Sequence, residues 1–194
     1  MNIFVYSSFP DGAEEQILKN NWKIYDFVNR QLKNRIPAEH FYKLNLRIKE
    51  YKGQFERDGL DSDDKAADSK YMGRVGADKN PYNCQMMINY FDIKRVFHNK
   101  SNFHIDFLTQ DGVIESFKDA YYFMFFHGLG HIVAFYNNFD RYLKFVDDQL
   151  NDIYEDGSDQ ARAYSLAGKL FREWKSLSKP KGLFLVESNE SVKG

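Results

Sequence analysis

Residues 120–136 read AYYFMFFHGLGHIVAFY, and this stretch decides the fold class. The run is almost wholly apolar and is interrupted only by His127, Gly128, Gly130 and His131. A membrane span needs ~20 apolar residues with few polar groups. This run is shorter, contains two histidines and has charged or amide residues on both sides. Because a helix that is apolar all round belongs in a protein core, we predict a buried central helix over 120–136 and no association with a membrane.

Amphipathic segments on both sides of this run predict about five helices around it. Before it, apolar residues recur every three or four positions over residues 11–36 and again over 37–55. After it, the same spacing recurs near residues 139–154 and 159–177. Only the short break at Pro37 separates the first two segments, so we expect these two helices to be neighbours in space.

Strand signals are fewer. Residues 103–117 alternate with period two on either side of the turn TQDG, which predicts an antiparallel β-hairpin. Residues 3–7 and 182–186 predict short strands, whereas residues 82–98 fit either structure, and we favour a strand after Ile93. The expected fold class is therefore α+β: a mainly helical domain with a small antiparallel sheet that includes the 103–117 hairpin.

Length and composition predict one domain in a reducing compartment. The chain has 194 residues, of which 43% are hydrophobic, so we expect a single globular domain over residues 1–187. Within it, residues 58–68 read as a mobile acidic loop, and residues 188–194 as a disordered tail. The single cysteine, Cys84, excludes an internal disulfide, and no signal peptide is recognisable, so we expect a cytoplasmic protein.

His127 and His131 are the strongest candidates for chemistry. They lie four residues apart, so on a helix they share one face, which is the spacing of zinc ligands on helices. The zinc-protease pattern needs a glutamate directly after the first histidine, and Gly128 stands there instead. His104 and Asp106, two apart on an expected strand, are further candidates. We expect the histidine pair to be core packing, with no cofactor; metal binding and acid–base catalysis remain alternatives.

Acidic residues are the candidates for partner binding. Asp61, Asp63 and Asp64 lie in the 58–68 loop, and Asp152 and Asp156 lie further along the chain. The second group imitates the start of a calcium loop, but the twelfth position is alanine rather than glutamate. We therefore expect these carboxylates to face a basic surface on another protein and to steer its association.

Composition and missing motifs favour a binding protein over an enzyme. Aromatic residues make up 17% of the chain and are enriched at the centres of protein interfaces, although an AT-rich genome would produce the same excess. The net charge of −1 argues against nucleic acid as the partner. We expect a cytoplasmic inhibitor that occludes another protein, of the kind seen in immunity proteins or phage inhibitors. A small hydrolase or transferase that uses the histidine pair is the alternative.

Overall fold

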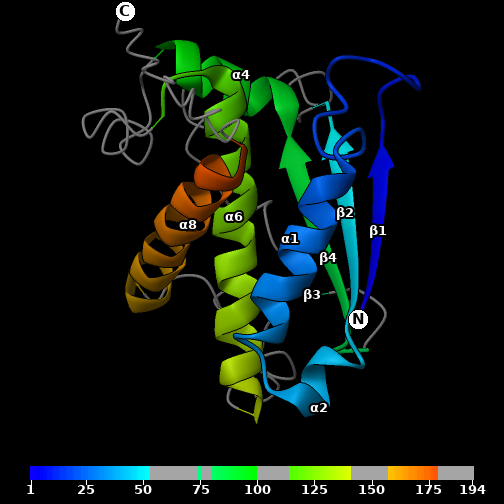
Figure 1. The fold of residues 1–194 in the computed structure, drawn as a ribbon, viewed down its shortest axis with the longest axis vertical. Helices are drawn as coiled ribbons and strands as arrows, with labels where there is room; N and C mark the ends of the chain where they lie inside the picture. Colours follow the sequence, from blue (N-terminus) through cyan, green and yellow to red (C-terminus); the bar gives the residue numbers. More distant parts are fainter. Residues whose placement is uncertain (53–73, 76–79, 100–113, 141–156, 179–194) are drawn as a thin grey trace, which may run out of the picture.

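The computed structural model describes residues 1–52, 74–75, 80–99, 114–140 and 157–178. In these residues a sheet lies beside a group of helices, as Figure 1 shows. The sheet has three parallel strands in the order β1 (Asn2–Ser7), β2 (Asn45–Tyr51) and β4 (Asn83–Asn89). A two-residue strand, β3 (Arg74–Val75), pairs antiparallel with β4.

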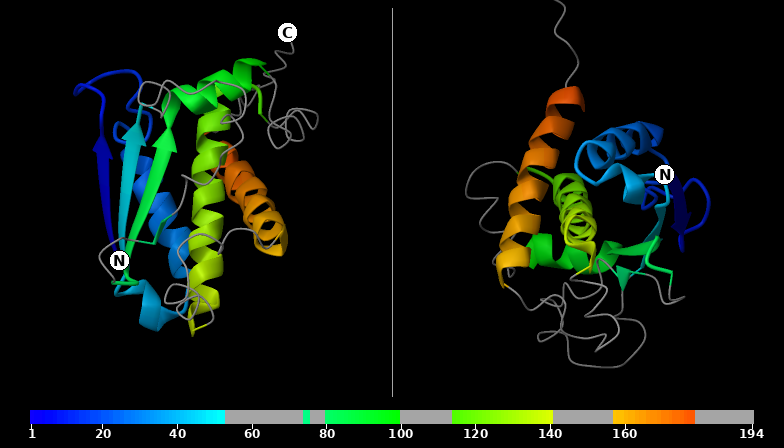
Figure 2. Two further views of the ribbon diagram at one scale, coloured as in Figure 1. Left: turned by 180° about the vertical axis from the view of Figure 1, so that it is seen from behind. Right: turned by 90° about the horizontal axis from the view of Figure 1, so that it is seen from below.

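The helices of the described residues lie to one side of this sheet. They are α1 (Trp22–Lys33), the one-turn α2 (Ala38–Phe41), α4 (Tyr90–Asn99), α6 (Phe117–Asn137) and α8 (Gly157–Ser178). Seen from behind, in the left panel of Figure 2, the strands lie in front of α1. Helix α6 stands beside α1, and α8 packs against α6. This mixed α/β arrangement contradicts the expected α+β fold with an antiparallel sheet.

Strand β2 shows why the helix expected over residues 37–55 is wrong. Its side chains alternate strictly, with Leu46, Ile48 and Glu50 buried and Arg47 and Lys49 exposed. Alternation with period two places one set against the helices and the other set on the outer face. The apolar residues of this segment also fit a helical period, but pairing with β1 and β4 on both sides selects the strand.

Two other element predictions near the sheet are wrong. The expected first helix begins at Trp22 rather than near residue 11, and residues 11–20 form turns in which Gly12 has a positive φ of 81°. The ambiguous segment contains β4 first and α4 second, so Ile93 lies in a helix and not before a strand. Here the strand precedes the helix because Cys84, Met86 and Ile88 alternate into the core.

The buried helix expected over residues 120–136 is present as α6. Ser116 caps its first turn by accepting a hydrogen bond from the backbone N–H of Asp119 at 3.1 Å. Every side chain from Ala120 to Ile132 is buried. Within the described residues, no helix combines the length and apolar character that a bilayer crossing requires.

The last helix, α8, covers the side of α6 that faces away from the sheet, and it confirms the helix expected near residues 159–177. Phe27 of α1 contacts Phe126 and Trp174, with ring centroids 5.5 and 5.4 Å apart. The three helices therefore share one aromatic core. In addition, Lys175 of α8 forms ion pairs with Glu115 and Asp119 at the start of α6, at 2.8 and 3.2 Å.

Several predicted segments lie outside the described residues. They are most of the 103–117 hairpin, the helix over 139–154 beyond residue 140, the strand over 182–186, the acidic loop 58–68 and the tail 188–194. The described end of the hairpin does not form a strand, because residues 114–116 are irregular and Phe117 begins α6.

Candidate functional site

Helix α6 brings His127 and His131 together, as their spacing predicts. Their Nε2 atoms lie 3.2 Å apart, and the two rings meet at 73°. Their side chains are buried, with 1% of His127 and 9% of His131 exposed. One Nε2–H donating to the other Nε2 accounts for the separation when both rings are neutral.

Helix α8 closes over this pair. The ring of Tyr164 stacks on His127, with centroids 3.9 Å apart and planes 16° apart. One turn further along α6, a Cβ built on Gly130 would lie only 2.7 Å from both the Cα and the carbonyl oxygen of Ala163. The glycine thus permits direct contact between the two helix backbones, which is one of the reasons for which glycine occurs within helices.

These contacts favour a packing role for the histidine pair. Burial raises the pKa of the Tyr164 phenol, so the phenol stays protonated near neutral pH. Among the described residues, no three His, Cys, Asp or Glu side chains converge in a way that could hold a metal ion. Catalysis by the pair remains a prediction, and its other expected members, His104 and Asp106, lie outside the described residues.

The remaining candidates from the sequence divide in the same way. The acidic residues expected to bind a partner all lie outside the described residues: Asp61, Asp63, Asp64, Asp152 and Asp156. Cys84 is described, and it is buried on the inner face of β4. Burial raises the pKa of its thiol to about 12, which disfavours the reactive thiolate.

Sequence reasoning missed Glu50, a completely buried carboxylate at the carboxyl end of β2. Its Oε1 accepts hydrogen bonds from the backbone N–H of Leu18 at 2.6 Å and from the Tyr121 hydroxyl at 3.3 Å. Its Oε2 accepts from the backbone N–H of Lys19 at 3.1 Å. Burial raises the pKa of Glu50, and the hydrogen bonds oppose that rise.

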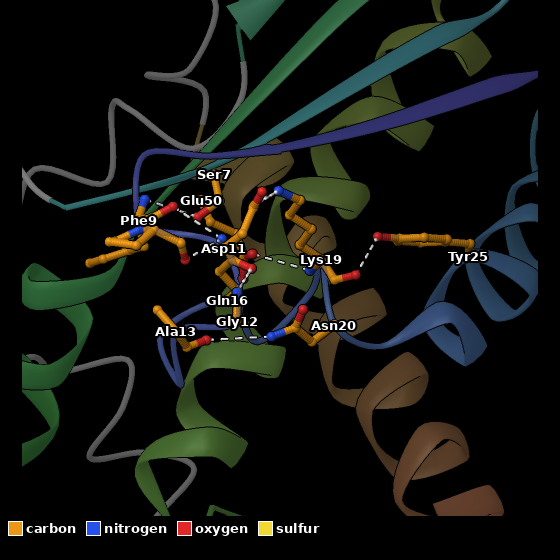
Figure 3. A network of polar contacts seen from close by, with 11 residues as sticks. Ser7, Phe9, Asp11, Gly12, Ala13, Gln16, Lys19, Asn20, Tyr25 and Glu50 are labelled. Atoms are coloured by element: carbon orange, nitrogen blue, oxygen red, sulfur yellow. Dashed lines mark hydrogen bonds and ion pairs between the residues drawn. The ribbon is translucent and has the colours of Figure 1, made fainter.

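Glu50 and a second buried polar residue, Gln16, organise the loop between β1 and α1 (Figure 3). The Gln16 Nε2 donates to the carbonyl oxygens of Phe9 and Pro10 at 3.0 and 2.7 Å. Its Oε1 accepts from the backbone N–H of Gly12 at 3.3 Å. The polar groups of Gln16 and Glu50 are thus used within the fold. The alternation of residues 45–51 was the signal that could have placed Glu50 inside.

The outer face of the sheet has a different composition. Strand β1 presents Phe4 and Tyr6, which are 43% and 53% exposed, and β2 presents exposed Arg47 and Lys49. The register sets Phe4 beside Arg47 and Tyr6 beside Lys49. The Lys49 Nζ also lies 5.4 Å from the ring centroid of Tyr51. The only carboxylate of β1, β2 and β4 is Glu50, and it points inward, so this face is aromatic and cationic.

Comparisons with known proteins add no relative. No family model matches the chain, and neither a curated protein nor a solved structure is significantly similar to it.

Proposed function

We propose that the protein is a binding protein that docks an acidic surface of another protein on the outer face of its sheet and acts by occluding that surface. The observation that carries the proposal is the combination of exposed aromatic side chains with Arg47 and Lys49 on a face whose strands contribute no carboxylate. Aromatic residues and arginine are the residue types that most often dominate binding energy at protein interfaces.

Charge on this face favours an acidic partner. Arg47 and Lys49 belong to the same strand and point the same way, two residues apart, so their fields add over the face. Complementary charge speeds association, and reversing it slows encounter. A cytoplasmic setting fits the cysteine usage, because the single cysteine of the chain, Cys84, is a buried free thiol.

A protein partner fits the face better than nucleic acid does. Tight binding of nucleic acid rests on many phosphate contacts from lysine and arginine. Strands β1, β2 and β4 offer two exposed cations on this face, Arg47 and Lys49, and Lys49 lies over the Tyr51 ring. The buried histidine pair favours this non-enzymatic function, because only 1% of the His127 surface is exposed and a substrate could hardly reach its ring.

The test is a paired charge reversal. Arg47→Glu with Lys49→Glu reverses the outer face, and Lys23→Glu with Arg30→Glu makes the same change on the exposed side of α1. Partners are captured by cross-linking in the native cell, purified, and titrated against wild type and both variants at several salt concentrations.

We expect the sheet variant to slow association at least tenfold and the α1 variant to bind as wild type does. Equal affinity of the sheet variant, or equal loss in both variants, contradicts the proposal. Single-stranded oligonucleotides are tested in parallel by fluorescence anisotropy. Binding of these that depends on Arg47 and Lys49 replaces the protein partner with nucleic acid.

A further inference from the structure

Strand β1 is the edge of the sheet, and its backbone groups divide into two sets. The N–H of Asn2 donates to Leu44 O at 3.0 Å, and the N–H of Ser8 donates to Glu50 O at 2.9 Å. Alternate residues of a strand point their backbone groups the same way. The even-numbered residues of β1 therefore pair with β2, and the N–H and C=O groups of Ile3, Val5 and Ser7 point away from the sheet.

Within the part of the chain that the structure describes, this edge carries none of the usual protection against pairing. Natural edge strands are guarded by charged side chains, proline, bulges or covering segments. β1 reads NIFVYS, with no charge and no proline, and its register with β2 is continuous from Asn2 to Ser7. Among the described strands, only β2 pairs with it. In Figure 1 no described helix or strand lies beyond β1 on that side.

The side chains of β1 are suited to a further strand. Ile3 and Val5 face the helices but are only partly buried against the core, because no strand of the described sheet flanks them on the open side. Phe4 and Tyr6 stand exposed on the outer face. A strand added to the edge would extend both faces.

We propose that the strand that covers this edge is β1 of a second copy of the chain, paired antiparallel about a two-fold axis at Val5. In that register Val5 lies opposite Val5 of the partner subunit, and Ile3 lies opposite Ser7 of the partner subunit. This places all three residues with outward backbone groups in hydrogen-bonded pairs. Two-fold registers centred on Phe4 or Tyr6 use only two of the three.

The same register makes the strand complementary to itself on the outer face. Phe4 lies opposite Tyr6 of the partner subunit, and by symmetry Tyr6 lies opposite the partner's Phe4. These are non-hydrogen-bonded positions, where side chains of antiparallel strands approach most closely, and aromatic pairs there are stabilising. Because β1 is uncharged, two copies meet without like-charge repulsion along the strand.

This inference shares Phe4 and Tyr6 with the proposed docking face, but it is tested at the edge of β1, whereas the docking face is tested through Arg47 and Lys49 of β2, so the two can fail separately. Dimerisation is measured by sedimentation velocity from low micromolar to millimolar protein. Wild type is expected to shift from 22.9 kDa toward twice that mass. Val5→Pro removes an outward N–H while leaving the ladder to β2 intact, and it is expected to weaken dimerisation at least tenfold.

Two further pairs of variants test the side chains and the register. Tyr6→Lys is expected to yield monomer, and the matched Tyr42→Lys, at an exposed tyrosine in the turn after α2, is expected to dimerise as wild type does. Val5→Cys is expected to form a disulfide between subunits, because the Cα atoms of such a pair lie about 5.5 Å apart. Ile3→Cys is the control, since its copies lie about 14 Å apart in this register.

Three results would overturn the inference: wild type that stays monomeric at every concentration, Tyr6→Lys that dimerises like Tyr42→Lys, or Ile3→Cys that cross-links as readily as Val5→Cys. Circular dichroism shows whether Val5→Pro retains its fold. If it does not, Tyr6→Lys and the cysteine pair decide the outcome.

Discussion

Replacing Gly130 by alanine is expected to destabilise the protein, although alanine is the better helix former. In a helix interior, alanine is favoured over glycine by about 1 kcal/mol. Against this, the new Cβ would lie 2.7 Å from the Cα and carbonyl oxygen of Ala163, so the backbones of α6 and α8 must separate. Overpacking a well-filled core costs typically about 1–3 kcal/mol. Because the obstacle is backbone, which cannot rotate away, the upper part of that range applies, and the net loss is about 1–2 kcal/mol.

Gly168 provides a matched control in α8. A Cβ there would first meet the Arg172 Nη1 at 3.6 Å, which is ordinary contact with a flexible side chain. Gly168→Ala is therefore expected to gain up to about 1 kcal/mol from helix propensity. Urea denaturation followed by circular dichroism measures both changes, and about 1 kcal/mol corresponds to about 2–4 °C in Tm at this size. Gly130→Ala as stable as wild type would refute the close contact between α6 and α8.

Two further predictions concern buried ionisable groups. The pKa of Glu50 is raised in the fold, so ionisation of its carboxyl group lowers the stability of the protein. We therefore compare the free energy of unfolding of wild type with that of Glu50→Gln. Wild type should have its greatest advantage below the unfolded-state pKa of Glu50, and this advantage should fall as the pH rises through the folded-state pKa. Urea titrations from pH 4 to pH 8 measure this difference, and a difference that grows with pH contradicts the assignment. At neutral pH the glutamine NH2 faces a backbone N–H, and the variant should lose about 1–3 kcal/mol. Cys84, buried with its thiol pKa raised to about 12, should not react with a thiol reagent in the native protein and should react fully in denaturant; rapid native labelling would show that β4 opens.

The sequence was sufficient for helix α6 and insufficient for the sheet. A run that is apolar all round predicts a buried helix, and the bounds of α6 lie close to the expected range of 120–136. Strand β2 was misjudged because Leu44, Ile48 and Tyr51 satisfy a helical spacing, while Leu46, Ile48 and Glu50 satisfy a strand spacing. The second pattern places a glutamate in the core, and only the N–H groups of a loop some 30 residues earlier make that placement favourable. Such long-range compensation cannot be read from a local window.

The candidate sites show the same limit. The spacing of His127 and His131 correctly predicted that their rings lie close together. Their exposure to solvent, however, depends on α8, which places Tyr164 over His127. Exposed aromatics on β1 could not be recognised before the sheet order was known, because residues 3–7 read equally well as a central or an edge strand.

The bond between the Glu50 carboxylate and the N–H of Leu18 spans 32 residues. We therefore expect the turns that precede α1 to take their final shape together with the docking of β2 beside β1, because docking without them would bury the Glu50 carboxylate without these donors. Residues 1–52 should then order in a single cooperative step, without a partly formed N-terminal helix accumulating beforehand.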